Sequence, residues 1–141
     1  NLPVPVIKKC PERKAIRFYR RLLHTIFDEM KTIAPNLVSL KTSYEAALWW
    51  KFGRLDRNGN GVLERSEWKG YRAAIRMWKH VRTCGRNFFR ACDSNLDRRV
   101  TRGEWRACTA FRPRGLRDQH SPTPTPYELL NPFLYILKPE N

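Results

Sequence analysis

Two segments of twelve residues carry oxygen-bearing side chains at the spacing of EF-hand calcium loops. Such a loop wraps one ion with oxygens from positions 1, 3, 5, 7, 9 and 12, while a glycine at position 6 makes the sharp turn. Residues 56–67 fit this pattern at each key position. Their predicted ligands are the backbone carbonyl of Val62 and the side chains of Asp56, Asn58, Asn60, Glu64 and Glu67, with Glu64 binding directly or through water.

The other residues of this first loop favour calcium over an ordinary turn. Gly61 occupies position 6, and Leu63 occupies the apolar position 8, which pairs with its counterpart in a partner loop. Stretches of Asp, Asn and Gly also occur in surface turns. A turn, however, requires neither Leu63, nor a glutamate at position 12, nor aromatic helices on both sides.

Residues 93–104 form the second loop and show one departure from the pattern. Arg98 stands at position 6, where a residue other than glycine needs an uncommon backbone conformation that would weaken or distort the site. Val100 is placed to pair with Leu63. We predict two Ca²⁺ sites. The ligands of the second are the backbone carbonyl of Arg99 and the side chains of Asp93, Asn95, Asp97, Thr101 and Glu104.

The segments around the loops predict an all-α fold, with one long helix followed by two helix-loop-helix units. Residues 11–33 form an amphipathic helix, which ends at Pro35. Ser43 is the predicted N-cap of the helix that enters the first loop. The remaining helices are expected at 68–78, 86–92 and 105–111. The apolar face of the first helix is predicted to contain Ile16, Tyr19, Leu23, Ile26, Met30 and Ile33.

The four cysteines, Cys10, Cys84, Cys92 and Cys108, are an even set without a Cys-x-x-Cys motif, and the three histidines are scattered. This spacing favours disulfides over zinc or free thiols, and disulfides would place the chain outside the cytosol. A bond between Cys92 and Cys108 would join the helices on either side of the second loop. A hand closed in this way favours structural calcium over a conformational switch.

Residues 84–108, in which cysteines frame the second loop, resemble the second hand of the extracellular calcium-binding domain of the SPARC (osteonectin) family. The stretch Cys10-Pro-Glu-Arg-Lys and the helix after it look most like the SPARC-related modular calcium-binding proteins (SMOC). The resemblance covers about residues 8–112. Members of the family also accept a basic residue at position 6, which lessens the objection to Arg98.

The resemblance implies an EF-hand pair with the N-terminal helix in its groove and with the disulfides Cys10–Cys84 and Cys92–Cys108. It also implies secretion to the matrix or cell surface and binding to heparan sulfate proteoglycans. The SMOC branch adds modulation of growth-factor signalling of the BMP type, through growth factors or their receptors. Collagen binding belongs to the SPARC branch and stays an alternative, because its contact residues cannot be matched here.

The net charge of +15, from 28 Lys and Arg against 13 Asp and Glu, favours a polyanionic partner. A solvated helix face usually mixes charges of both signs, whereas acidic residues are absent between Glu67 and Asp93. With secretion expected, a sulfated glycan is the preferred ligand. The candidate residues are Arg13, Lys14, Arg17, Arg20, Arg21, Arg72, Arg76, Lys79, Arg82, Arg86 and Arg90.

The chain is expected to divide into an extension at 1–9, the calcium-binding domain at 10–112 and a proline-rich tail at 113–141. No segment approaches the roughly 18 apolar residues of a membrane span. An intracellular calcium sensor that binds a target helix is the other alternative, and it would need free thiols. No recognised motif supports nucleic-acid binding, and no histidine lies beside a nucleophile, so an enzyme is not expected.

Overall fold

The computed structural model describes residues 3–114 and 116, and within them it confirms the mainly helical fold. Of the predicted proline-rich tail at 113–141, residues 115 and 117–141 lie outside the described residues. The elements in chain order are α1 (Glu12–Ile33), η1 (Pro35–Leu37), α2 (Tyr44–Leu55), β1 (Val62–Glu64), α3 (Arg65–Ile75), α4 (Arg82–Cys92), β2 (Arg99–Thr101) and α5 (Arg102–Cys108).

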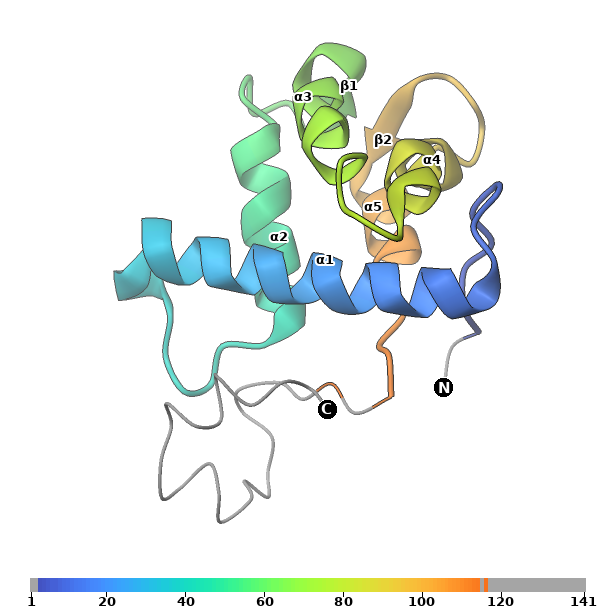
Figure 1. Ribbon diagram of the computed structural model, residues 1–141. Coiled ribbons are helices and arrows are strands. Elements are labelled where there is room, and N and C mark those ends of the chain that lie inside the picture. The colour runs from blue at the N-terminus through green and yellow to red at the C-terminus, as the bar shows by residue number, and fades with distance from the viewer. Residues whose placement is uncertain (1–2, 115, 117–141) are drawn as a thin grey trace.

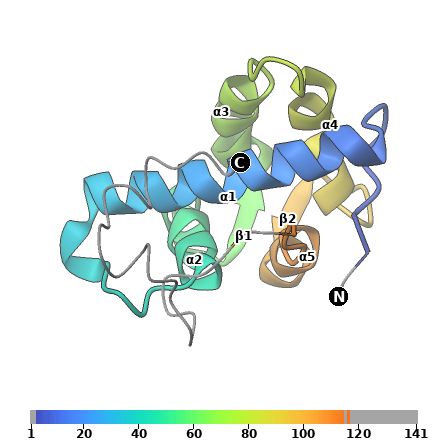
Figure 2. The same ribbon diagram turned by 60° about the horizontal axis from the view of Figure 1, so that its bottom comes forward.

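Helix α1 spans the width of the molecule and lies in the groove of the EF-hand pair (Figure 1). In the turned view, α3 and α4 lie on one side of α1, α2 and α5 lie on the other, and the two strands lie between them (Figure 2). The apolar face of α1 is broader than predicted, because Phe18, Leu22 and Phe27 are buried as well. Ile33 was wrongly placed on this face. It is the last residue of the helix and is 46% exposed.

The predicted helix ends were the least accurate part of the interpretation. Helices α3 and α5 begin inside the loops, at positions 10 of each, because the side chains at positions 9 and 12 form capping boxes there. Both helices also end three residues earlier than predicted, at Ile75 and Cys108. Helix α4 begins at Arg82 instead of residue 86, and the break between the two hands falls at residues 76–81.

Strands β1 and β2 join the two hands through a short antiparallel pair. Leu63 lies opposite Val100 in the register, and both side chains are completely buried. This confirms the predicted contact between the residues at position 8. The pairing places the two loops side by side at one end of the helices.

Two disulfides fasten the structure, and both have the expected pairing. Cys10–Cys84 ties the segment before α1 to α4, and Cys92–Cys108 ties the end of α4 to the end of α5. They close chain segments with sequence separations of 74 and 16 residues. In the chain-entropy account, such cross-links stabilise the fold by about 4 and about 3 kcal/mol against the reduced chain.

Candidate calcium sites and basic surface

The first loop is organised around Asp56, whose carboxylate is turned inward at the C-terminal end of α2. One of its oxygens accepts from the backbone N–H of Gly61 at 2.7 Å, and the other accepts from that of Asn60 at 3.3 Å. Gly61 has a φ of 82°, a left-handed conformation that glycine adopts without steric cost. These bonds curl the backbone around the space in which a cation would sit.

The other end of the first loop presents two more carboxylates. Glu67 is buried, and its two oxygens accept from the backbone N–H groups of Glu64 at 3.0 Å and Asn58 at 3.2 Å. The side-chain amides of Asn58 and Asn60 donate to the Glu64 carboxylate, each at 3.2 Å. The predicted ligand side chains of this loop therefore converge on one another.

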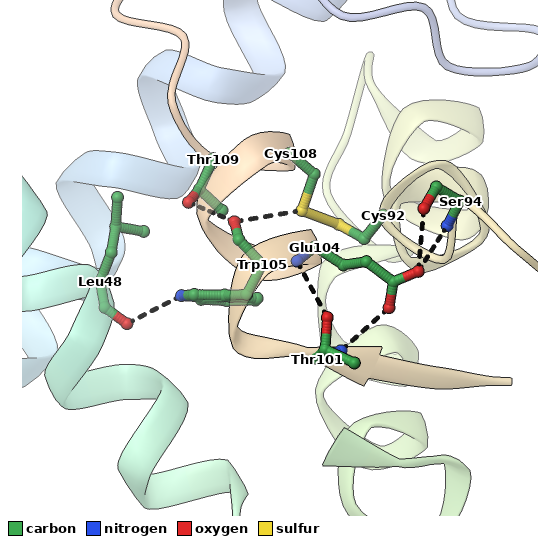
Figure 3. Close-up of a disulfide and its surroundings, with 8 residues drawn as sticks. All are labelled: Leu48, Cys92, Ser94, Thr101, Glu104, Trp105, Cys108 and Thr109. Carbon is green, nitrogen blue, oxygen red and sulfur yellow. Dashed lines mark hydrogen bonds between the residues drawn. A yellow bond between two sulfur atoms is a disulfide. The ribbon is translucent and has the colours of Figure 1, made fainter. Parts of the chain in front are cut away.

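The second loop repeats the bonds to position 1, and it differs in one partner of position 12, where Ser94 at position 2 takes the place of Asn58 at position 3. Asp93 accepts from the backbone N–H groups of Arg98 at 2.6 Å and Asp97 at 3.2 Å, which matches the role of Asp56. Glu104 accepts from the N–H of Thr101 at 2.9 Å, and from the N–H and hydroxyl of Ser94 at 3.0 and 2.9 Å. Figure 3 shows the Glu104 carboxylate held between these two residues.

Arg98 adopts the uncommon conformation that its position demands, with a φ of 67°, and its side chain is exposed. The preceding Leu96, at position 4, is also left-handed at 57°, a feature that the sequence interpretation missed. Despite these two residues, the hydrogen bonds to Asp93 match those to Asp56 in the first loop. The expected distortion of the second loop is therefore absent, because the strain stays within the backbone of two exposed residues.

The second loop gathers three carboxylates at the place where a cation would bind. Asp93, Asp97 and Glu104 each offer an oxygen, and these oxygens lie within 4.8 Å of one another. The backbone N–H of Arg99 is the main cause that lowers the pKa of Asp97. Burial opposes ionisation of Glu104, but hydrogen bonds from Thr101, Ser94 and Asn95 hold its pKa below the ordinary value. A set of ionised oxygens suits a hard cation such as Ca²⁺.

Comparison with known proteins agrees with this geometry. Residues 23–108, more than half of the chain, match the family described as the "Secreted protein acidic and rich in cysteine Ca binding region". The chain belongs to this family. It is thus a secreted, extracellular calcium-binding module, as its resemblance to SPARC predicted. Among solved structures, none matches the chain significantly.

Relatives with this module come from several branches of the SPARC family. Mouse testican-2 is 37% identical over 70 residues, which are 50% of this chain and 15% of testican-2. Human SPARC-related modular calcium-binding protein 1 is 26% identical over 110 residues, 70% of this chain and 25% of that protein. Chicken SPARC is 35% identical over 60 residues, 42% of this chain and 19% of SPARC. The chain therefore spans a quarter or less of each relative.

In this member of the SPARC family a disulfide joins the two helices of the second hand. The Cys92–Cys108 disulfide lies beside Glu104, and the next residue, Trp105, donates its indole N–H to the carbonyl of Leu48 at 3.1 Å (Figure 3). Trp105 is completely buried, so this bond links α5 to α2 of the first hand within the core.

The predicted polyanion-binding residues fall into groups with different surroundings. Lys14, Lys79 and Arg82 line one open cleft together with His80 and Thr83, which the sequence analysis did not include. Three others contact the protein itself. The guanidinium of Arg72 lies 5.9 Å from the Trp68 ring and its Nε is buried, that of Arg21 lies 4.8 Å from the Trp78 ring, and Arg20 donates to the carbonyl of Arg114 at 2.9 Å. The remaining candidates, Arg13, Arg17, Arg76, Arg86 and Arg90, are exposed.

Within the described part of the chain, no helix is both long enough and apolar enough to cross a bilayer.

Proposed function

We propose that this chain is a matricellular module in which two Ca²⁺ ions fix the fold and a basic exterior binds heparan sulfate proteoglycans. Through that attachment it modulates the distribution or signalling of growth factors of the BMP type. The proposal takes residues 10–112 as the calcium-binding domain, flanked by the extension at 1–9 and the tail at 113–141.

For calcium, the proposal assigns one ion to each loop through the ligands predicted from the sequence. The match in hydrogen bonds between Asp56 and Asp93, and between Glu67 and Glu104, supports equal roles for positions 1 and 12 in both loops. Bound calcium would neutralise carboxylates that otherwise repel one another, and it would thereby stabilise the folded state. The closed second hand supports a structural role for the ion.

The observation that carries the glycan part is the segregation of charge. Residues 13–27 and 68–92 contain five and seven Lys or Arg respectively, and neither segment contains an acidic residue. Among the described residues, the salt bridges are Lys31–Asp28 and Lys51–Glu29, both outside the cluster of basic side chains. Carboxylates of the described residues therefore do not neutralise the cations of this cluster. The family takes its description from a protein that is acidic, whereas this chain has a net charge of +15. The basic charge is therefore a feature of this chain and does not follow from the family description.

Heparin chromatography tests the glycan proposal. The disulfide-intact chain, loaded in calcium, should stay on immobilised heparin at physiological salt and elute in a NaCl gradient well above it. A neutral agarose column and a weakly charged cation exchanger are the matched controls for non-specific retention. Elution from heparin at or below physiological salt would contradict the proposal.

The two alternative functions are an intracellular calcium sensor and a collagen-binding module. An intracellular sensor is excluded by the four bonded cysteines and the extracellular family, and α1 already fills the groove in which a target helix would lie. Collagen binding has no feature among the described residues that favours it over glycan binding.

A further inference from the structure

The molecule has a cleft of about 420 Å³ whose polar lining is entirely cationic or neutral. Lys14 comes from the first turns of α1, Lys79 and His80 come from the connection between α3 and α4, and Arg82 and Thr83 come from the start of α4. Two segments far apart in the sequence, residue 14 and residues 79–83, thus bring basic side chains to a shared space. From this geometry we propose that the cleft is the sulfate-binding site of the module, an inference that rests on the glycan binding proposed above.

The walls of this cleft are fixed before any ligand arrives. The Cys10–Cys84 disulfide joins the two sides, since Cys10 lies four residues before Lys14 and Cys84 lies two residues after Arg82. A second tie lies nearby, where the side-chain amide of Asn87 donates to the carbonyl of Lys8 at 2.7 Å. The backbone on both sides of the cleft is thus positioned in advance, so binding a charged group requires ordering of the side chains alone.

The connection between α3 and α4 turns its two basic residues outward. Trp78 packs with Phe18 of α1, at 5.7 Å between ring centroids, and Val81 is buried in the core. Between these two anchors, Lys79 and His80 are exposed, and His80 takes a left-handed φ of 71°. The chain thus bulges into solvent at the edge of the cleft.

The surroundings of the cleft favour a long polyanion over a small anion. The volume of the cleft exceeds what one sulfate group needs and lies within the range of ligand-binding clefts. Beyond it, the exposed Arg13, Arg17 and Arg21 repeat every four residues along α1, and Arg86 and Arg90 continue from Arg82 along α4. Four residues of helix advance about 6 Å, so each row offers regularly spaced cations to a chain that leaves the cleft.

The test compares two variants with the same loss of charge. The cleft variant carries Lys14→Ala, Lys79→Ala and Arg82→Ala, and the control carries Lys41→Ala, Arg54→Ala and Arg106→Ala. The control residues are exposed, do not line the cleft and lie outside the basic segments 13–27 and 68–92. Each variant loses three positive charges. Circular dichroism and calcium-dependent melting check that both are folded, and calorimetry with a heparin octasaccharide measures binding at several NaCl concentrations.

We expect the cleft variant to bind the octasaccharide about tenfold to a hundredfold more weakly. The slope of log Kd against log salt concentration should also become shallower, by about one for each lost contact. The control should lose less than about threefold. Equal losses in both variants would overturn the cleft and indicate diffuse attraction. Wild-type chain that fails to bind heparin at physiological salt would instead contradict the proposed function. Tighter binding to a single-stranded DNA of equal charge, or to phosphatidylserine vesicles, would overturn the sulfated glycan as ligand.

Discussion

Replacing Glu104 with Gln should change the stability of the fold little in the absence of calcium and lower it in the presence of calcium. Glutamine keeps the shape of the side chain and removes one negative charge from the group formed with Asp93 and Asp97, whose oxygens lie within 4.8 Å. At that separation each like-charge pair costs about 1 kcal/mol in a water-like medium, so the substitution relieves about 2 kcal/mol of repulsion. Against this, a glutamine has one acceptor oxygen instead of two, which costs about 1 kcal/mol in lost hydrogen bonding to Ser94 or Thr101. In EDTA the variant should therefore melt within a few degrees of the wild type.

In calcium the balance changes, because the variant loses a bidentate ligand. At saturating calcium, each tenfold loss of affinity removes about 1.4 kcal/mol of the stabilisation that binding contributes. For a domain of this size that corresponds to about 4–8 °C in Tm. The calcium-induced rise in Tm should thus fall by at least this amount. Differential scanning calorimetry of the disulfide-intact chain in 1 mM CaCl₂ and in EDTA measures both values.

Two matched variants make this result specific. Glu67→Gln changes the same position in the first loop and should have an effect of similar sign and size, because Glu67 makes equivalent backbone hydrogen bonds. Glu12→Gln makes the same chemical change at an exposed site at the start of α1 and should leave the calcium-induced rise unchanged. An undiminished rise in Glu104→Gln would refute the second calcium site, and an undiminished rise in Glu67→Gln would refute the first.

Two further predictions concern the backbone. A β-carbon at Gly85 would overlap the backbone carbonyl of Ile75, whereas the position of Gly70 in α3 is open. Gly85→Ala should therefore destabilise the fold by about 1–3 kcal/mol, and Gly70→Ala should stabilise it by up to about 1 kcal/mol. Urea denaturation measures both changes. Equal effects of the two substitutions would show that the close approach of α4 to α3 is unimportant. Arg98→Gly relieves a left-handed conformation worth about 1–2 kcal/mol but adds flexibility worth about 0.5–1 kcal/mol, so stability should change by less than about 1.5 kcal/mol. Its calcium affinity by isothermal titration should stay within about threefold of wild type, and a tenfold loss would mean that Arg98 itself supports the loop.

The geometry of the two candidate calcium loops could be predicted from the sequence because consecutive residues determine it. Twelve consecutive residues determine which oxygens face the ion, so the spacing of Asp56, Asn58, Asn60 and Glu67 was sufficient to place the first loop. Leu63 and Val100 added one contact between the loops, and the register confirms it. The conformation of Leu96 was missed because position 4 of the loop carries no ligand, and its requirement appears only in the backbone.

The basic cleft could not be predicted in the same way, because it depends on tertiary structure. Sequence spacing suggested rows of cations along single helices. The structure instead brings Lys14 beside Lys79 and Arg82, across a disulfide with a sequence separation of 74 residues. His80 carries no formal charge in the count of basic residues, so that count omitted it. Its place in the cleft follows from the buried residues on either side of the bulge.

The two disulfides that hold helix α4 favour a structural role for the module over a conformational switch. Cys84, near its first turn, is bonded to the segment before α1, and Cys92, its last residue, is bonded to α5. A sensor exposes its groove by swinging such a helix outward, but here either motion would strain a covalent bond. The calcium loops lie at one end of α4 and the cleft lies at the other. Under the proposed function, calcium would stabilise the loops, while the Cys10–Cys84 bond joins the two backbone segments of the cleft.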